Sequence, residues 1–124
     1  MDITPTISDE INLIGSYGDN EVTIKLIKHP IPLYVAKNQV VSVKLINLAE
    51  LDLEFFVHNQ QYFNNIECLL LGCGNTCQMP SDALKALIAD LTYTVEIMTI
   101  GAACRTYNVL AGEDRKIGLL LLKA

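Results

Sequence analysis

The sequence predicts an α/β domain in which a largely parallel sheet is covered by helices on both sides, with an additional β-hairpin from the N-terminal half. Two observations indicate this class. In the second half of the chain, short apolar runs typical of buried strands alternate with segments that have helical spacing. Hydrophobic residues make up 51% of the chain, which fits strands buried on both faces or an apolar patch that awaits a partner.

The length of 124 residues fits a single domain, to which we assign residues 11–124. Residues 1–10 combine Pro5 with acidic and hydroxyl side chains, so we expect this N-terminus to be loosely ordered. No internal repeat and no low-complexity segment divides the rest of the chain.

The first half of the chain is predicted to form strands. An apolar run at residues 11–14 is followed by turn residues at 15–20 and by alternating apolar and polar residues at 22–27. Together they predict a hairpin with one solvated face. Two further strands are expected at residues 33–35 and 40–46.

The second half is predicted to alternate helices with strands. Apolar spacing indicates a helix at about residues 51–60, and Ser81 is the expected N-cap of a second helix. A third helix is expected at residues 102–111, with Gly112 as its stop. Because each helix connects two strands, right-handed crossovers and a largely parallel sheet follow. The connected strands are expected at residues 66–71, 95–98 and 117–122.

Charge and hydropathy argue against two classes of protein. The net charge of −5 is unlike that of a nucleic-acid binder, whose affinity depends on clustered lysines and arginines. Lys25, Lys28 and Lys37 fall in one sector with His29, which a lysine-guarded sheet edge explains better than a nucleic-acid patch. No apolar run approaches the ~18 residues of a transmembrane helix. The acidic N-terminus lacks the order of a secretory signal, so a cytoplasmic location is expected.

The cysteines are expected to be reduced thiols, because a chain without a signal sequence is expected to stay in a reducing compartment. They are Cys68, Cys73, Cys77 and Cys104. No Cys-x-x-Cys pair is present, so no metal centre is expected. Glu113-Asp114 is interpreted as a solvated turn rather than a catalytic carboxylate pair, and we predict neither catalytic residues nor a cofactor.

The most informative segment spans residues 95–108, where an apolar strand runs into a glycine turn and a helix. Backbone N–H groups at a helix start lack intrahelical acceptors and favour anions. We expect these donors to border a cleft with the glycine loop at residues 72–77. That loop follows a strand, but it lacks the Gly-Lys-Ser/Thr ending of a phosphate-binding loop. The donors belong to Gly101, Ala102, Ala103 and Cys104.

Two side chains at this helix start each have two interpretations. Cys104 is either a reactive thiol whose pKa is lowered beside Arg105, or a small buried side chain that seals the helix against the sheet. Neither of the chain's two histidines is placed beside it by the sequence. Arg105 is either an anion clamp or a structural group. Tyr107 and Asn108 are expected to complete the local packing, with the Asn108 amide bonded to loop backbone.

Three segments carry a family resemblance. They are Ser16-Tyr17-Gly18, the run from Leu69 to Gly74 followed by Pro80, and residues 101–110. They resemble the MTH-nine-three-eight-like family, which has no established reaction and includes the mitochondrial complex I assembly factor three; the resemblance covers about residues 11–122. It implies a three-layer fold with a mixed sheet whose last strand is antiparallel, plus an accessory hairpin. The chain departs from the family pattern at Thr99-Ile100 and Cys73, which removes polar groups from the expected pocket.

We therefore predict a non-enzymatic interaction or assembly protein, and the resemblance implies subunits of a respiratory complex as its partners. The alternative is a small-molecule or anion-binding protein, or a cysteine-dependent enzyme, that uses the cleft between residues 72–77 and 99–105. A homodimer through an open sheet edge is left open. The predicted binding residues are Gly72, Cys73, Gly74, Gly101, Ala102, Cys104 and Arg105.

Overall fold

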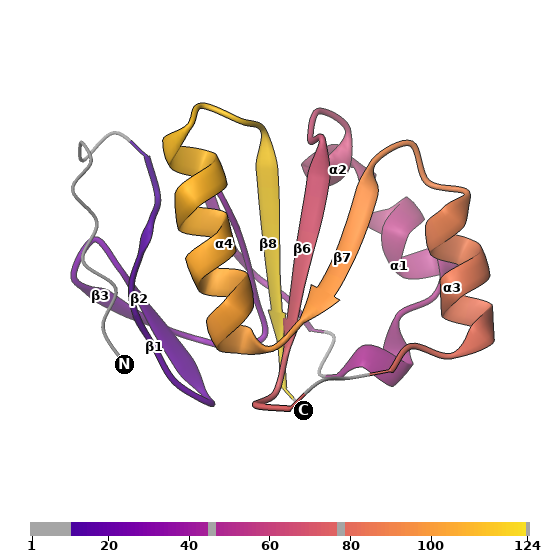
Figure 1. The fold of residues 1–124 in the computed structure, drawn as a ribbon, viewed down its shortest axis with the longest axis horizontal. Coiled ribbons are helices and arrows are strands. Elements are labelled where there is room, and N and C mark those ends of the chain that lie inside the picture. Colours follow the sequence, from indigo (N-terminus) through magenta and orange to yellow (C-terminus); the bar gives the residue numbers. More distant parts are fainter. Residues whose placement is uncertain (1–10, 45–46, 77–78, 124) are drawn as a thin grey trace.

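The computed structural model describes residues 11–44, 47–76 and 79–123 of the chain. Three sequence expectations lie outside these residues: the loosely ordered N-terminus, the thiol of Cys77, and the end of the strand expected at 40–46. The described residues form a small three-stranded sheet and a central five-stranded sheet (Figure 1). This mixed α/β architecture confirms the predicted fold class.

The central sheet has the strand order β5-β4-β8-β6-β7. Strand β6 is parallel to both β7 and β8. Strand β4 is antiparallel to β8 and to β5, which joins it through a tight turn. The strands are β4 (Leu33–Ala36), β5 (Gln39–Ser42), β6 (Cys68–Cys73), β7 (Thr94–Met98) and β8 (Ile117–Leu122).

The orientation of the last strand corrects one detail that the family resemblance implied. Strand β8 is antiparallel only to β4, and it is parallel to β6. The reason is the connection through helix α4 (Ile100–Gly112), which carries the chain from the end of β7 back along the sheet. Strand β8 therefore starts at the same end of the sheet as β6 and β7 and runs parallel to them. The antiparallel character of the sheet comes from the N-terminal half of the chain.

The accessory hairpin is a three-stranded antiparallel meander of β1 (Ile14–Tyr17), β2 (Glu21–Ile24) and β3 (Ile27–Pro30). The single strand expected at residues 22–27 was wrong, because the chain turns at Lys25 and Leu26. Both residues have positive φ values, 51° and 68°. The apolar side chains of the alternating pattern are buried only as far as Ile24, since Leu26 is 96% exposed.

Helices cover both faces of the central sheet. In Figure 1, α4 lies to the left of β8 with the small sheet beyond it, and α1, α2 and α3 lie on the other side of the central strands. Helix α3 packs on the same side as α1 and α2, through Leu84. The remaining helices are η1 (Leu48–Glu50, a 3-10 turn), α1 (Leu53–His58), α2 (Gln60–Phe63) and α3 (Asp82–Ala89).

Helix boundaries follow capping side chains. Ser81 caps α3 as predicted, because its Oγ accepts a hydrogen bond from the Leu84 N–H at 3.1 Å. The helix expected at 51–60 is split at Asn59, whose side-chain amide donates to the Phe55 carbonyl at 2.8 Å. Helix α4 begins two residues earlier than expected, after Thr99.

Two hydrophobic cores share the central sheet, one on each face. Alternate residues of the central strands point to opposite cores. Leu70, Leu119 and Leu121 join the core beneath α4 and the small sheet. On the other face, Leu69, Leu71 and Leu120 pack toward the remaining helices. This two-sided burial explains why β6 and β8 are almost entirely apolar.

Candidate functional site

The loop after β6 does meet the start of α4, but the two close directly on each other. The Ile100 N–H donates to the Gly74 carbonyl at 2.9 Å. Thr99 is the N-cap: its Oγ1 accepts from the Ala102 N–H at 3.3 Å, and its carbonyl accepts from the Ala103 N–H at 2.9 Å. Two of the donors expected to face a ligand are therefore bonded within the chain. A threonine directly before a helix is a capping signal, and it was visible in the sequence.

Gly72 is a packing glycine in this structure. A Cβ at this position would lie 2.9 Å from the Ala103 Cβ, 2.9 Å from the Leu121 Cδ2 and 3.2 Å from the Ile100 Cα. Its missing side chain lets α4 approach β6 and β8 closely. Gly74 has a different reason to be glycine, since its φ of 64° is in the left-handed region.

The two thiols at the predicted cleft are sealed in the interior. Cys73 and Cys104 each have 0% exposure. Burial raises the pKa of the Cys73 thiol to about 12. Burial also raises the pKa of Cys104 to about 12, against a smaller lowering effect of the Arg105 charge. A thiol with this pKa is protonated at neutral pH, so the structure agrees with the buried interpretation of Cys104 and gives no reactive thiolate.

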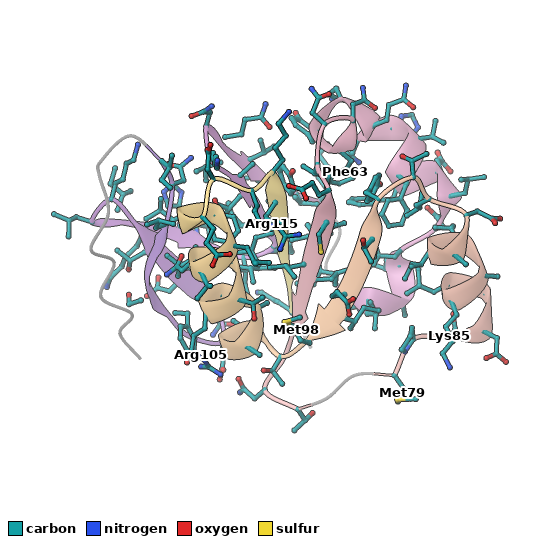
Figure 2. All side chains as sticks on the ribbon, turned by 45° about the horizontal axis from the view of Figure 1, so that its top comes forward. Phe63, Met79, Lys85, Met98, Arg105 and Arg115 are labelled. Carbon is teal, nitrogen blue, oxygen red and sulfur yellow. The ribbon has the colours of Figure 1, made fainter. Side chains whose placement is uncertain are left out.

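Arg105 lies at the surface near the start of α4 (Figure 2). Its Nη1 donates a 2.6 Å hydrogen bond to the Tyr17 hydroxyl, and the guanidinium carbon lies 5.9 Å from the centre of the Tyr17 ring. Gly101 makes room for both groups, because a Cβ there would lie 2.9 Å from the Tyr17 hydroxyl and 3.1 Å from Arg105 Nη1. Two segments of the resemblance, Ser16-Tyr17-Gly18 and residues 101–110, thus meet at one place.

Tyr107 and Asn108 attach the small sheet and the segment before it to α4. The Tyr107 hydroxyl donates to the Asn12 carbonyl at 2.7 Å. Asn108 Oδ1 accepts from the Ile14 N–H, and Asn108 Nδ2 donates to the Ile14 carbonyl, both at 2.8 Å. Burial raises the pKa of Tyr107 above its ordinary value. The expected backbone bond of the Asn108 amide is present, at strand β1 rather than at a loop.

A small hollow of about 200 Å³ remains beside the glycine loop. Gly74 is the predicted binding residue that lines it, while Gly72, Cys73 and Cys104 are packed elsewhere. No local signal joins its other residues, because they come from separate segments of the chain. They are Asp19, Asn20, Asn75, Ile100 and Lys123.

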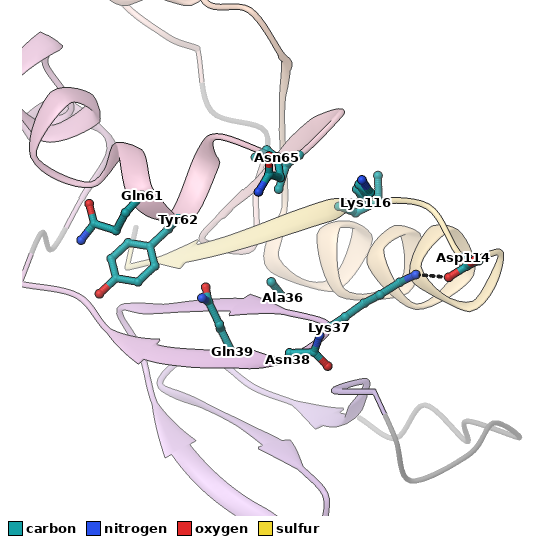
Figure 3. A pocket seen from close by; sticks show the side chains of 11 residues that line it. Ala36, Lys37, Asn38, Gln39, Gln61, Tyr62, Asn65, Asp114 and Lys116 are labelled. Atoms are coloured by element: carbon teal, nitrogen blue, oxygen red, sulfur yellow. Dashed lines mark hydrogen bonds and ion pairs between the residues drawn. The ribbon is translucent and has the colours of Figure 1, made fainter.

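A larger hollow of about 370 Å³ lies at the opposite end of the central sheet, beside the β4–β5 turn and the start of β8 (Figure 3). Lys37 forms an ion pair with Asp114 at its rim. Sequence reasoning missed this hollow, since only the tertiary structure brings its side chains together. Its other polar lining residues are Asn38, Gln39, Gln61, Tyr62, Asn65 and Lys116.

Within the described ranges, no three His, Cys, Asp or Glu side chains are grouped so that they could hold a metal ion. None of the helices in the same ranges combines the length and apolar composition needed to cross a membrane.

The fold and the α4 junction define a small mixed α/β domain of the Mth938-like class. The chain belongs to the family of proteins of unknown function DUF498/DUF598, whose model matches residues 14–122. The predicted MTH-nine-three-eight-like resemblance is thereby confirmed.

Solved bacterial structures share this fold. A protein of Bartonella henselae described as an outer membrane protein has 23% identity and a TM-score of 0.76, over 94% of this chain and 98% of that one. A Bordetella parapertussis protein has 24% identity and a TM-score of 0.77, over 95% and 98%. A Bordetella pertussis protein described as a Mth938-like domain has 21% identity and a TM-score of 0.74, over 98% and 92%. At these identities the likeness establishes the fold alone.

A curated relative matches part of the chain. It is the "13 kDa major membrane protein" of Francisella tularensis subsp. holarctica, which is 31% identical over 58 residues. The match covers 47% of this chain and 47% of that protein, so the chain spans about half the length of this relative.

Proposed function

We propose that this chain is a non-enzymatic interaction protein that holds a protein partner at the surface formed by Tyr17 and Arg105. The observation that carries the proposal is the arrangement of Arg105, whose guanidinium is fixed by the Tyr17 hydroxyl at 2.6 Å while the side chain stays exposed. Within the described part of the chain, Arg105 forms no ion pair with a carboxylate. Arginine and tyrosine are the residue types that most often dominate binding energy at interfaces.

The chemistry of this surface fits a carboxylate on the partner. A guanidinium binds a carboxylate through parallel hydrogen bonds, and a preorganised guanidinium loses less side-chain entropy when it does so. The resemblance to the assembly-factor branch of the family suggests the class of partner, namely subunits of a respiratory complex. We propose that residues 11–124 act as one domain in the cytoplasm, at the periphery of a membrane to which the partner belongs. The membrane-protein names of the Francisella and Bartonella relatives support the association with a membrane, whereas the cytoplasmic location rests on the sequence prediction alone.

Quantitative capture of partners from native lysate at near-endogenous expression tests the proposal. Wild type is compared with Arg105→Gln, and the matched control is Lys85→Gln, an exposed lysine on α3 at the opposite side of the molecule (Figure 2). A defined partner should be recovered by wild type and by the control. Loss of one partner of a desolvated charge pair costs ~2 kcal/mol or more, so Arg105→Gln should reduce recovery at least about tenfold. An identical set of proteins from wild type and Arg105→Gln would contradict the proposal.

A second candidate function is the binding of a small anion or polar molecule in the 200 Å³ hollow beside Gly74. Lys123, Asn20 and Asn75 favour it, because they supply a cation and two amides to one small space, and the Asp19 carboxylate at the same hollow favours a polar molecule over a simple anion. A thermal-shift screen of anions and nucleotides separates the two functions. A ligand at about 100 times its dissociation constant adds roughly 2.7 kcal/mol to the free energy of unfolding, and the gain should disappear in Lys123→Gln but persist in Arg105→Gln.

We also propose to test whether two copies of the chain form a homodimer through an edge strand. Strands β5 and β7 end the central sheet, and each pairs on one side only among the described strands. Sedimentation at increasing concentration would show a doubled mass if a second copy adds to either edge.

A further inference from the structure

The turn between β2 and β3 has a backbone conformation that its two central residues disfavour. Lys25 and Leu26 are its two central residues, with φ values of 51° and 68°. Two-residue hairpin turns of this kind favour Asn and Gly, because a Cβ is crowded in the left-handed region. A leucine is among the less suitable residues for this position.

Packing within the chain does not explain the leucine either. Leu26 is 96% exposed and its neighbour Ile27 is 60% exposed, whereas Ile24 at the end of β2 is 2% exposed. Leu26 therefore combines an unfavourable backbone conformation with an apolar side chain in water. Residues that break two local rules at once, without a gain inside the fold, point to a role outside it.

The charges around this tip are positive, in contrast to the chain as a whole. The chain carries a net charge of −5, yet residues 24–29 contain Lys25 and Lys28 and no acidic residue. The nearest ion pair joins Lys28 to Glu21 at 3.9 Å between exposed side chains, so solvent screens it and Lys28 remains available. Two cations thus flank two exposed apolar side chains.

We propose that the β2–β3 tip docks on a lipid surface that carries anionic headgroups. Leu26 and Ile27 enter the boundary between headgroups and acyl chains, and the ammonium groups of Lys25 and Lys28 stay at the level of the lipid phosphates. Long lysine side chains reach water and phosphate while apolar neighbours are inserted, which is the pattern of an interfacial membrane contact. The acidic remainder of the chain is repelled by such a surface, so the tip is the part that approaches it.

This inference goes beyond the proposed partner binding and does not depend on it. Tyr17 lies at the end of β1 near the β1–β2 turn, while Leu26 lies beyond the other end of β2. The small sheet that carries the tip is at the side of the molecule farthest from α3 (Figure 1). A chain docked through Leu26 leaves the Arg105 surface accessible to a partner.

Flotation of the full chain with protein-free vesicles tests the proposal. Vesicles of phosphatidylcholine alone are compared with vesicles that contain about one-third phosphatidylglycerol, at low and at physiological salt. Two apolar side chains and two cations give a weak contact, so we expect wild type to float with the anionic vesicles at low salt and to be released by salt. Wild type should float far less with the neutral vesicles. Failure of wild type to float with anionic vesicles at low salt would overturn the proposal.

Leu26→Asn is the decisive variant, because asparagine adopts positive φ readily and the turn should fold at least as well. We expect its vesicle-bound fraction to fall about tenfold while its thermal unfolding temperature is maintained or raised. The matched control is Val109→Asn on α4, which removes another apolar side chain that is 60% exposed and should leave flotation unchanged. Equal flotation of Leu26→Asn and wild type, or an equal loss in Val109→Asn, would show that this tip is not the docking element.

Discussion

Replacement of Asn108 by alanine should loosen the small sheet from helix α4. The Asn108 amide accepts from the Ile14 N–H and donates to the Ile14 carbonyl, both at 2.8 Å and both partly buried. Alanine leaves both backbone groups of Ile14 without these partners. An unmade buried hydrogen bond costs about 1–3 kcal/mol, so with partial access of water we expect the free energy of unfolding to fall by about 2–4 kcal/mol.

Two measurements check this expectation. Urea denaturation gives the change in the free energy of unfolding, and hydrogen exchange reports the Ile14 amide, which should lose protection more than amides of β6. Asn64→Ala is the matched control, because Asn64 is exposed and should change stability by less than about 0.5 kcal/mol. A loss below about 0.5 kcal/mol for Asn108→Ala, or an unchanged exchange rate at Ile14, would refute the role assigned to this amide.

Asn108→Asp separates the two bonds without a change of shape. The carboxylate still accepts from the Ile14 N–H, but its second oxygen faces the Ile14 carbonyl and repels it. The repulsion disfavours the charged form, so the pKa of this aspartate should be raised in the folded state above its unfolded value of about 4. Such a group contributes stability below the unfolded pKa and loses it as the pH rises through the folded pKa. The deficit relative to wild type should therefore grow from pH 4 to pH 7, and a constant deficit would contradict the assignment.

Three further changes test other parts of the structure. Gly72→Ala should lower the free energy of unfolding by about 1–3 kcal/mol, because its Cβ would lie 2.9 Å from side chains of α4 and β8. The control is Gly18→Ala, whose Cβ would meet nothing closer than 3.9 Å. Equal losses of unfolding free energy for the two variants in urea denaturation would contradict the close-packing argument. In a Cys68→Ser, Cys77→Ser background, the remaining thiols are Cys73 and Cys104, both buried. They should react with a disulfide reagent at pH 8 far more slowly than a peptide thiol, since burial raises the pKa of each to about 12, and a peptide-like rate would exclude sealed thiols. Leu26→Asn should raise the free energy of unfolding by about 0.5–1 kcal/mol through relief of the positive φ, and a thermal melt that shows a loss instead would mean that the leucine is favourable in the turn.

Elements with strong local signals were predictable from the sequence. Strand β8 has the predicted bounds, because a run of six apolar residues after a turn has few alternatives in a chain of this class. The cap at Ser81 was also predictable, since a hydroxyl side chain before an amphipathic run is a local signal. Neither prediction depends on distant residues.

The turn at Lys25 and Leu26 was not predictable by the same reasoning. Neither residue is typical of a tight turn, and the pattern Val22, Ile24, Leu26 continues the alternation of a strand. Hydrogen bonds between β2 and β3 hold the chain in a conformation that these residues do not favour by themselves.

The sequence predicted that the glycine loop and the start of α4 lie close together, but it did not predict that the two segments close directly on each other. The sequence brought the glycine loop and the start of α4 together, and the bond from Ile100 to Gly74 places them side by side. The prediction did not take up the capping signal of Thr99, which uses a helix donor, and no local signal indicated that Gly72 serves close packing. The residues of the remaining hollow, such as Asp19 and Lys123, lie about a hundred positions apart, so only the tertiary structure brings them together.

The position of β8 has a consequence for how the chain is made. This strand follows all the other described strands in the sequence, yet in the sheet it lies between β4 and β6. Without β8, the pairs β4–β5 and β6–β7 have no strand between them, and the apolar edges of β4 and β6 lack the partner that joins them into one sheet. A nascent chain halted before Ile117 would then be a target for chaperones or proteases, and completion of one six-residue strand would remove that vulnerability.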